Sequence, residues 1–288
     1  MRLARISFAL IMTCLLSNNS SPWAQAFASD GVTLEDLLAH HLAAIGSSDA
    51  RSAAKTRVVQ GAAAYRIVVG GSGRADGKTG LVSEGRKLRF MMKFNGVDYL
   101  GENLVFDGSG IGVSFANTNK SRSPFASFVS TQDVILRDGL LGGVLTTGWA
   151  LLDVFERKPK LTLEGLKRID GQQVYQVRYV PHKHSDVQIL LYFDQETFRH
   201  VKTVYSTSVA NNVGATITES SKLLPERSTL EERFSDFKTV DGLTLPRHWN
   251  LQFTRELPNG STTISEWDLK EDQITNNMGL DPKNFEVK

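Results

Sequence analysis

The sequence of 288 residues has one cysteine, Cys14, and no long apolar run. A lone cysteine excludes an internal disulfide, so a hydrophobic core must hold the fold. The chain is long enough to bury such a core. No stretch offers the roughly 20 consecutive apolar residues of a membrane-spanning helix, which argues against an integral membrane protein.

Excess charge of either sign is also lacking once the first 28 residues are set aside. Those residues carry Arg2 and Arg5 and no acid, so 31 basic residues (33 minus 2) face 31 acidic residues in the remainder. No basic block stands out. A neutral chain of this kind argues against a nucleic-acid partner.

The first residues have the layout of a secretory signal peptide. Two arginines precede the apolar run 6–16, and two overlapping small-residue sites follow at 24–28. We therefore predict a cleaved leader over 1–28 and a periplasmic protein consisting of a single domain over 29–288. Either small-residue site fits cleavage. Cys14 lies inside the apolar run and follows Met12-Thr13, which does not match a lipoprotein signal.

The rest of the chain alternates mainly with the period of two that is typical of strands. A helix is predicted first, over 34–45, with Thr33 as its cap and Gly46 at its end, and a short helix over 49–55 follows. Strands are predicted over 57–69, 80–85, 87–95, 103–106, 111–115, 160–169, 173–180, 187–193, 199–206, 228–238, 243–255 and 262–269. Short turns join them, so the expected fold class is α+β, mainly β, with one large antiparallel sheet.

The stretch GGSGRADGKT, residues 70–79, looks at first like a phosphate-binding loop. Its spacing misses the P-loop pattern by one residue, and it joins a strand to a strand instead of leading into a helix. We predict an exposed hairpin loop over these ten residues.

The segment 131–155 is largely apolar and carries no charge from Gly139 through Leu152. Two interpretations stay open. The segment is either one or two buried helices packed on the sheet, or a movable lid, because its four glycines each weaken a helix by up to about 1 kcal/mol.

None of the six histidines stands in a recognised metal or catalytic motif. They are His40, His41, His182, His184, His200 and His248. The pair in the polar turn 181–186 has no further ligand nearby, the adjacent pair on the first helix points to different faces, and no Gly-x-Ser-x-Gly or His-Glu-x-x-His motif occurs. We expect no metal, no cofactor and no catalysis, although a triad assembled from distant residues stays open.

Large apolar side chains occupy alternate positions of three strands and define one greasy sheet face. They are Leu88, Phe90, Met92, Phe94, Ile189, Leu191, Phe193, Trp249, Leu251 and Phe253. The helix 34–45 and the segment 134–155 are the candidates to cover this face. If they leave space on a curved sheet, that space is a ligand site; a fully packed core is the alternative.

Three stretches resemble the periplasmic outer-membrane lipoprotein-sorting family of LolA and LolB type. They are LEDLLAHHLAAIGSSDARSAAKTRVVQG (34–61), LLYFDQETFRHVKTVY (190–205) and FSDFKTVDGLTLPRHW (234–249). The resemblance implies an unclosed half-barrel capped by helices, with a hydrophobic cavity that carries lipoprotein acyl chains. It also implies an arginine that latches a strand to the lid, for which Arg57 and Arg66 are both candidates.

We therefore expect an exported carrier that binds a lipoprotein acyl chain or another lipid without a cofactor, with transient membrane contact and an envelope protein partner both open. The ten apolar residues above would form the ligand wall. The lid would present Leu38, Leu42, Leu141, Leu145 and Trp149. The alternatives are an envelope structural protein with a filled core and, less favoured, a hydrolase with its site in the cleft.

Overall fold

The computed structural model describes residues 31–96, 98–114, 122–181, 183, 185–210 and 224–287. Residues Val32–Lys288 form one compact unit, to which everything below refers. The predicted leader lies outside the described residues, as do His182 and His184.

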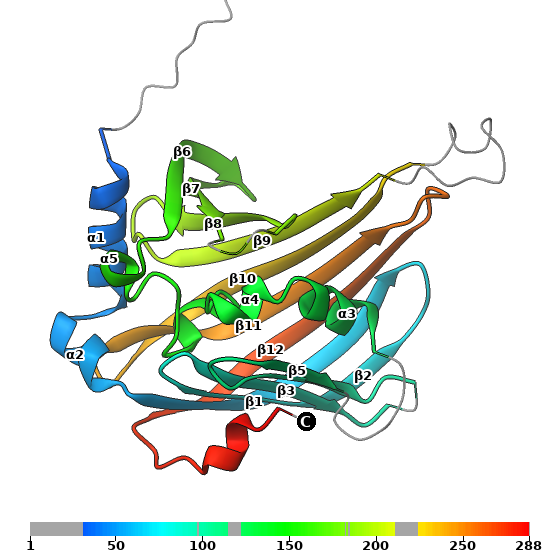
Figure 1. Cartoon of the computed structure of the whole chain (residues 1–288), viewed down its shortest axis with the longest axis horizontal. Coiled ribbons are helices and arrows are strands. Elements are labelled where there is room, and N and C mark those ends of the chain that lie inside the picture. Colours follow the sequence, from blue (N-terminus) through cyan, green and yellow to red (C-terminus); the bar gives the residue numbers. More distant parts are fainter. Residues whose placement is uncertain are drawn as a thin grey trace, which may run out of the picture. The chain divides into compact units, whose positions relative to one another are not determined.

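Twelve strands form one antiparallel sheet that does not close on itself (Figure 1). The strands are β1 (Thr56–Val69), β2 (Arg74–Glu84), β3 (Lys87–Phe94), β4 (Gly101–Phe106), β5 (Ile111–Ser114), β6 (Lys160–Ile169), β7 (Gln172–Val180), β8 (Gln188–Asp194), β9 (His200–Val209), β10 (Glu226–Val240), β11 (Leu243–Glu256) and β12 (Thr262–Asn276). Their order is β5-β4-β3-β2-β1-β12-β11-β10-β9-β8-β7-β6, so β5 and β6 are the two edges. The predicted fold class, mainly β with one large unclosed sheet, is confirmed.

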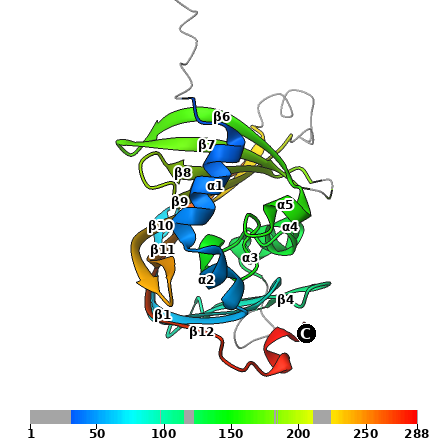
Figure 2. The same ribbon diagram turned by 90° about the vertical axis from the view of Figure 1, so that its left-hand side faces the viewer.

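The predicted N-terminal helix is α1 (Leu34–Ile45). Thr33 and Asp36 form a capping box at its start, where Thr33 Oγ1 accepts the Asp36 N–H at 3.1 Å. Its buried face presents Leu37, Leu38, His41, Leu42 and Ile45. The short helix α2 (Ser48–Ala53) follows, and in Figure 2 both helices lie in front of the curved sheet.

The hairpin loop is shorter than predicted, because β2 already begins at Arg74. Arg74 pairs with Arg66 of β1, and the Ile67 N–H donates to the Gly73 carbonyl at 2.9 Å, so the turn is confined to 70–73. Glycine and aspartate interrupt the alternation of apolar and polar residues here, so the first half of β2 does not show a strand pattern in the sequence. At Gly77 a Cβ would lie 2.1 Å from the Lys93 carbonyl oxygen, so this glycine permits close approach of β3 and does not mark a loop.

The helices predicted over 131–155 are present but are only four residues long each. A helix not predicted, α3 (Pro124–Thr131), comes first, with Ser123 as its cap. The cover segment, residues 134–155, then contains only the turns α4 (Val134–Arg137) and η1 (Gly143–Leu145), before α5 (Val154–Arg157) begins at its end. Gly139, Gly142 and Gly143 have positive φ, which breaks any continuous helix. A last turn, η2 (Pro282–Phe285), follows β12 near the end of the described chain.

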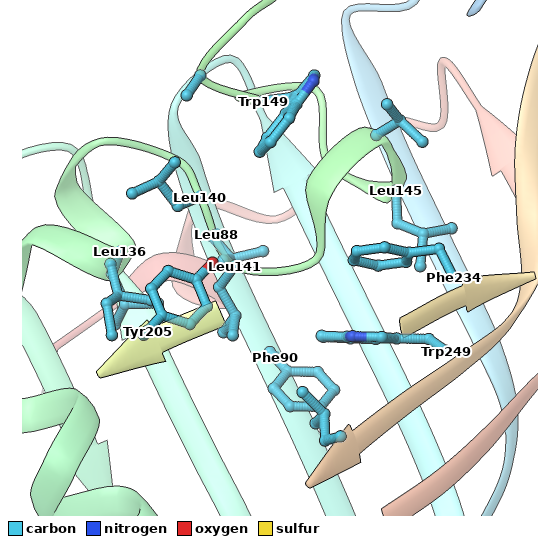
Figure 3. Close-up of a cluster of buried hydrophobic side chains, with 14 of the residues drawn as sticks. Leu88, Phe90, Leu136, Leu140, Leu141, Leu145, Trp149, Tyr205, Phe234 and Trp249 are labelled. Atoms are coloured by element: carbon cyan, nitrogen blue, oxygen red, sulfur yellow. The ribbon is translucent and has the colours of Figure 1, made fainter. Parts of the chain in front are cut away.

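The hydrophobic core lies between the inner sheet face, α1 and the cover segment. Cover residues such as Leu140, Leu141, Leu145 and Trp149 have no exposed surface. Figure 3 shows Leu141 and Leu145 directed toward the sheet side chains. The order of elements thus places an irregular, glycine-rich segment over the centre of an apolar sheet.

Candidate functional site

All ten residues predicted as a ligand wall point into the core and are at most 4% exposed. They belong to the same apolar cluster as the five predicted lid residues, which are at most 9% exposed. The strands therefore bring the wall and the lid together as expected. Their role in binding a ligand stays a prediction.

The centre of the interior is filled by the chain's own atoms. A Cβ at Gly143 would lie 2.8 Å from His200 Nδ1 and 3.2 Å from Phe234 Cζ, and one at Gly142 would lie 3.3 Å from Leu81 Cδ1. These glycines let the cover backbone rest directly on the sheet. A hydrocarbon chain fits at this place only after the cover segment moves.

One of the two candidate latch arginines reaches the cover segment. Arg57 on β1 is buried, donates from Nη1 to the Val144 carbonyl at 2.7 Å and from Nε to Asn276 Oδ1 at 2.8 Å, and burial lowers the pKa of its guanidinium to about 10. Arg66 lies on the surface and pairs with Glu266 at 2.8 Å. Arg57 therefore links strand to cover, and Arg66 does not.

A buried carboxyl that the sequence analysis missed makes a second link. Glu232 Oε1 accepts the Gly142 N–H at 2.9 Å, and Oε2 accepts the Tyr205 hydroxyl at 3.0 Å. Burial raises the pKa of Glu232 to about 8. The sequence does contain a signal for this inward position. Glu232 lies two residues from both Leu230 and Phe234 on one strand, so its side chain shares their inward face.

Two histidines join α1 and β9 to Trp149 of the cover segment. Trp149 Nε1 donates to His41 Nε2 at 3.1 Å, and His41 Nδ1 lies 3.1 Å from the Phe198 carbonyl, so His41 is neutral with its proton on Nδ1. Trp149 also stacks on His200 at 4.6 Å. Burial lowers the pKa of His41 to about 4 and that of His200 well below its usual value.

Beyond α3 the same sheet face is not filled, and a cavity of about 410 Å³ remains, which we call the mouth pocket. Its apolar wall is made by Tyr65, Tyr99, Phe125, Phe253 and Trp267. Ring centroids lie 4.2 Å apart for Tyr65 and Tyr99 and 5.0 Å apart for Phe125 and Trp267. Of the ten predicted wall residues, Phe253 lines this pocket.

A hydrogen-bond chain fixes the wall of the mouth pocket. Trp267 Nε1 donates to the Tyr99 hydroxyl at 2.9 Å, which donates to Glu102 Oε1 at 2.8 Å, and Ser123 donates to the same oxygen at 2.5 Å. Glu102 has no exposed surface, and its Oε2 has no partner among the described residues. Burial raises the pKa of Glu102 to about 7.

The outer face of the sheet carries a polar groove of about 720 Å³. Within it Ser235 Oγ lies 3.0 Å from His248 Nδ1, and His248 Nε2 contacts Asp268. This is the residue set of a hydrolase, but it lies opposite the cleft. The contacts are also exchanged relative to a Ser-His-Asp triad. In such a triad the serine contacts Nε2 and the aspartate contacts Nδ1, whereas here Ser235 lies at Nδ1 and Asp268 at Nε2.

The described residues contain no group of three or more His, Cys, Asp or Glu side chains placed to bind a metal ion. They also contain no helix with the length and apolar character needed to cross a membrane.

Comparisons with known proteins find likeness in structure alone. No protein-family model and no curated protein matches the chain. A LolA superfamily protein from Nitrosomonas europaea is 15% identical, covers 88% of this chain and 98% of its own, and has a TM-score of 0.45. An outer membrane lipoprotein-sorting protein domain from Vibrio parahaemolyticus is 10% identical over 86% and 97%, with a TM-score of 0.42.

A DUF1329 family protein from Desulfovibrio piger is 14% identical over 88% of this chain and 96% of its own, with a TM-score of 0.41. At such identities likeness concerns the fold alone. The resemblance to the LolA and LolB family inferred from the sequence agrees with these matches.

Proposed function

We propose that this protein is an exported carrier of an acyl chain, held between the inner sheet face and the cover segment. The observation that carries the proposal is the mouth pocket. Its wall residues Phe253 and Trp267 continue the face on which the cover rests, so a chain that starts in the pocket can extend under a displaced cover. The cavity of about 410 Å³ lies in the usual size range of ligand sites.

The burial energies of residues 140–149 of the cover and of an acyl chain are comparable. Moving these residues alone off the sheet exposes five buried apolar side chains, which costs about 7–15 kcal/mol at about 1.5–3 kcal/mol each. They are Leu140, Leu141, Val144, Leu145 and Trp149. A palmitoyl chain gains about 11 kcal/mol at about 0.8 kcal/mol per methylene. Exchange between the two is therefore close to balanced, as release of a cargo requires.

The links to the cover are suited to reversible opening. Arg57, Glu232 and Ser83 each bond one backbone group of residues 142–147, and Ser83 Oγ accepts the Thr147 N–H at 3.0 Å. These three hydrogen bonds from sheet side chains to the cover backbone are worth about 1 kcal/mol each.

A disulfide staple tests the proposal. Ser83→Cys and Thr147→Cys would join sheet and cover where they already touch, in protein prepared without the predicted leader 1–28, which removes Cys14, the one native thiol. We expect the oxidised staple to take up octanoate, which fits the mouth pocket, and to lose palmitate. Reduction should restore palmitate uptake, read by native mass spectrometry.

Each single-cysteine variant is the control and should bind both acids. Equal palmitate uptake in oxidised and reduced forms would contradict movement of the cover. No uptake of either acid by the unmodified protein would contradict the carrier itself.

The close contact of Gly142 and Gly143 with the sheet favours a second candidate, an envelope structural protein with a permanently filled core. Capture of one protein partner, together with lipid-free spectra of the reduced protein, would favour that candidate.

A further inference from the structure

Aromatic rings, more than aliphatic side chains, line the mouth pocket. Its five wall residues are all aromatic, and the ring planes of Tyr99 and Trp267 are inclined at 55°, those of Phe125 and Phe253 at 66°. Rings inclined in this way cannot form one flat stack, so they surround the cavity from several directions. An acyl chain needs no aromatic ring to stay dry, whereas a cation is attracted to ring faces.

The charge at the pocket is negative. Asp98 lines the pocket and is exposed at its opening. Arg74 is the basic residue among those that line the pocket, but it alternates with Ala75 and pairs across the strands with Arg66. Its guanidinium therefore lies on the outer sheet face, 3.9 Å from Asp76. A cation in the pocket would meet an acid and no facing base.

The buried carboxyl of Glu102 adds to this preference from behind the wall. It accepts the Tyr99 hydroxyl at 2.8 Å, and the same hydroxyl accepts the Trp267 N–H at 2.9 Å. Such a chain is polarised along its length, which makes the two rings richer in electrons. The second Glu102 oxygen has no partner among the described residues, and a nearby cation would favour the ionised form.

The polar groups of the aromatic wall are already in use. The Trp267 N–H and the Tyr99 hydroxyl both donate within the protein, and the Tyr65 hydroxyl lies 3.5 Å from Ser265 Oγ. A primary ammonium would lose hydrogen bonds to water against this wall without replacing them. A quaternary ammonium has no N–H to satisfy, so it loses none.

We propose that the mouth pocket holds the quaternary ammonium head of a lipid whose acyl chain extends under the displaced cover. The rings would contact the methyl groups of the head, and Asp98 and Glu102 would supply the opposite charge. A fatty acid still binds through its chain, with its carboxylate in water at the opening. This inference rests on the proposed carrier function and names the class of its cargo.

Two amphiphiles with the same chain and opposite heads test the inference. Octyltrimethylammonium and octanoate would each be titrated into the protein, with affinity read by calorimetry. We expect the cation to bind about five- to tenfold more tightly, the range of one or two ring contacts. Choline, which has the head without the chain, should bind at least about tenfold more weakly than octyltrimethylammonium. Equal binding of the two would identify a small solute as the ligand and overturn the assignment to a lipid.

Two variants with matched controls separate ring from charge. Phe125→Leu keeps an apolar side chain but removes a ring from the wall, and should lower the affinity for the cation about threefold and leave that for octanoate unchanged. Its control is Phe128→Leu, on the same helix but not lining the pocket. Glu102→Gln should also lower the affinity for the cation alone, whereas Asp76→Asn, an exposed acid outside the pocket, should not.

Equal affinities of the wild type for the two amphiphiles, or equal losses in Phe125→Leu and Phe128→Leu, would overturn the ammonium site. If Phe125→Leu loses both amphiphiles, Glu102→Gln decides, and an unchanged preference for the cation in that variant overturns the site. Uptake of palmitate without a preference for the cation leaves the carrier intact. Binding of octyltrimethylammonium by protein that takes up no palmitate would instead contradict the carrier.

Discussion

Two regions of one apolar sheet face differ in what occupies them. Under the cover segment, Phe90 and Trp249 are fully buried by the chain's own residues. Further along β11 and β12, Phe253 and Trp267 line a cavity of about 410 Å³. The strands are continuous between the two regions, so the sheet alone does not decide whether the face is filled.

The covering chain makes the difference. Gly142 and Gly143 bring backbone onto the sheet in the first region, whereas α3 contributes Phe125 as one wall in the second and leaves the middle open. A ligand site on this sheet is therefore set by how closely the cover approaches. That can be tested by loosening each region in turn.

The largest effect is expected at Arg57. Arg57→Met would leave the buried Val144 carbonyl and the Asn276 amide without their donor, which should cost about 3 kcal/mol of unfolding free energy in urea titration. The control Arg66→Met removes an exposed pair and should cost less than about 1 kcal/mol. If Arg57→Met and Arg66→Met lower the unfolding free energy equally, Arg57 does not act as a latch between strand and cover.

The contact at Gly143 should give the next largest effect. Gly143→Ala adds a methyl 2.8 Å from His200 Nδ1 at a φ of +49°, and should cost about 2–3 kcal/mol in thermal unfolding. Gly165→Ala, at a φ of +85° with open space around it, isolates the backbone strain at about 1 kcal/mol. Because Gly143→Ala destabilises the closed cover, it should also raise palmitate affinity. A fall in affinity would argue against competition between cover and chain.

Stability should depend on pH through Glu232. The raised pKa of about 8 means that the folded state keeps its proton while the unfolded state, with a pKa near 4.5, has lost it. Stability therefore falls as pH rises from about 4.5 to about 8, by at most about 1.4 kcal/mol per unit.

Comparison with Glu232→Gln isolates this group above pH 7. Glu102 and Glu271, whose pKa values burial raises to about 7, still titrate there in both proteins, whereas the lowered pKa of His41, about 4, acts only below pH 6.5. Between pH 7 and 8 the wild type should lose about 1 kcal/mol more stability than Glu232→Gln. The same slope in both would show that another group is responsible.

The smallest effect is expected in the mouth pocket. Tyr99→Phe leaves Trp267 Nε1 without an acceptor and takes a donor from Glu102, which should cost about 1 kcal/mol and weaken octanoate binding. Tyr65→Phe, whose hydroxyl lies 3.5 Å from its partner, should cost less than about 0.5 kcal/mol. If both variants bind octanoate like the wild type, the hydrogen-bond chain does not shape the pocket.

The sheet could be predicted from the sequence because the alternation that marks a strand is visible within each short segment. Alternation identified each strand to within a few residues except β2 and β12, and Thr33 as the cap marked the start of α1. At β2, the residues Asp76 and Gly77 obscured the period although the backbone is fully paired.

The cover and the links that hold it could not be predicted in the same way. Arg57 and Val144 are 87 residues apart, and Glu232 and Gly142 are 90 residues apart, so no spacing indicates that they meet. The mouth pocket depends on the loop that brings Tyr99 against Trp267, a contact across 168 residues. Among the five residues of its wall, alternation in the sequence predicted Phe253 and none of the others.

Hydrogen exchange at the amides of Gly142 and Thr147, with and without a palmitoyl lipid, tests the central claim most directly. Both amides donate to sheet side chains when the cover is closed, at 2.9 Å and 3.0 Å. Displacement of the cover by the chain predicts that lipid speeds their exchange about tenfold or more. Unchanged or slower exchange at both amides, in protein that native mass spectrometry shows to hold lipid, would contradict it.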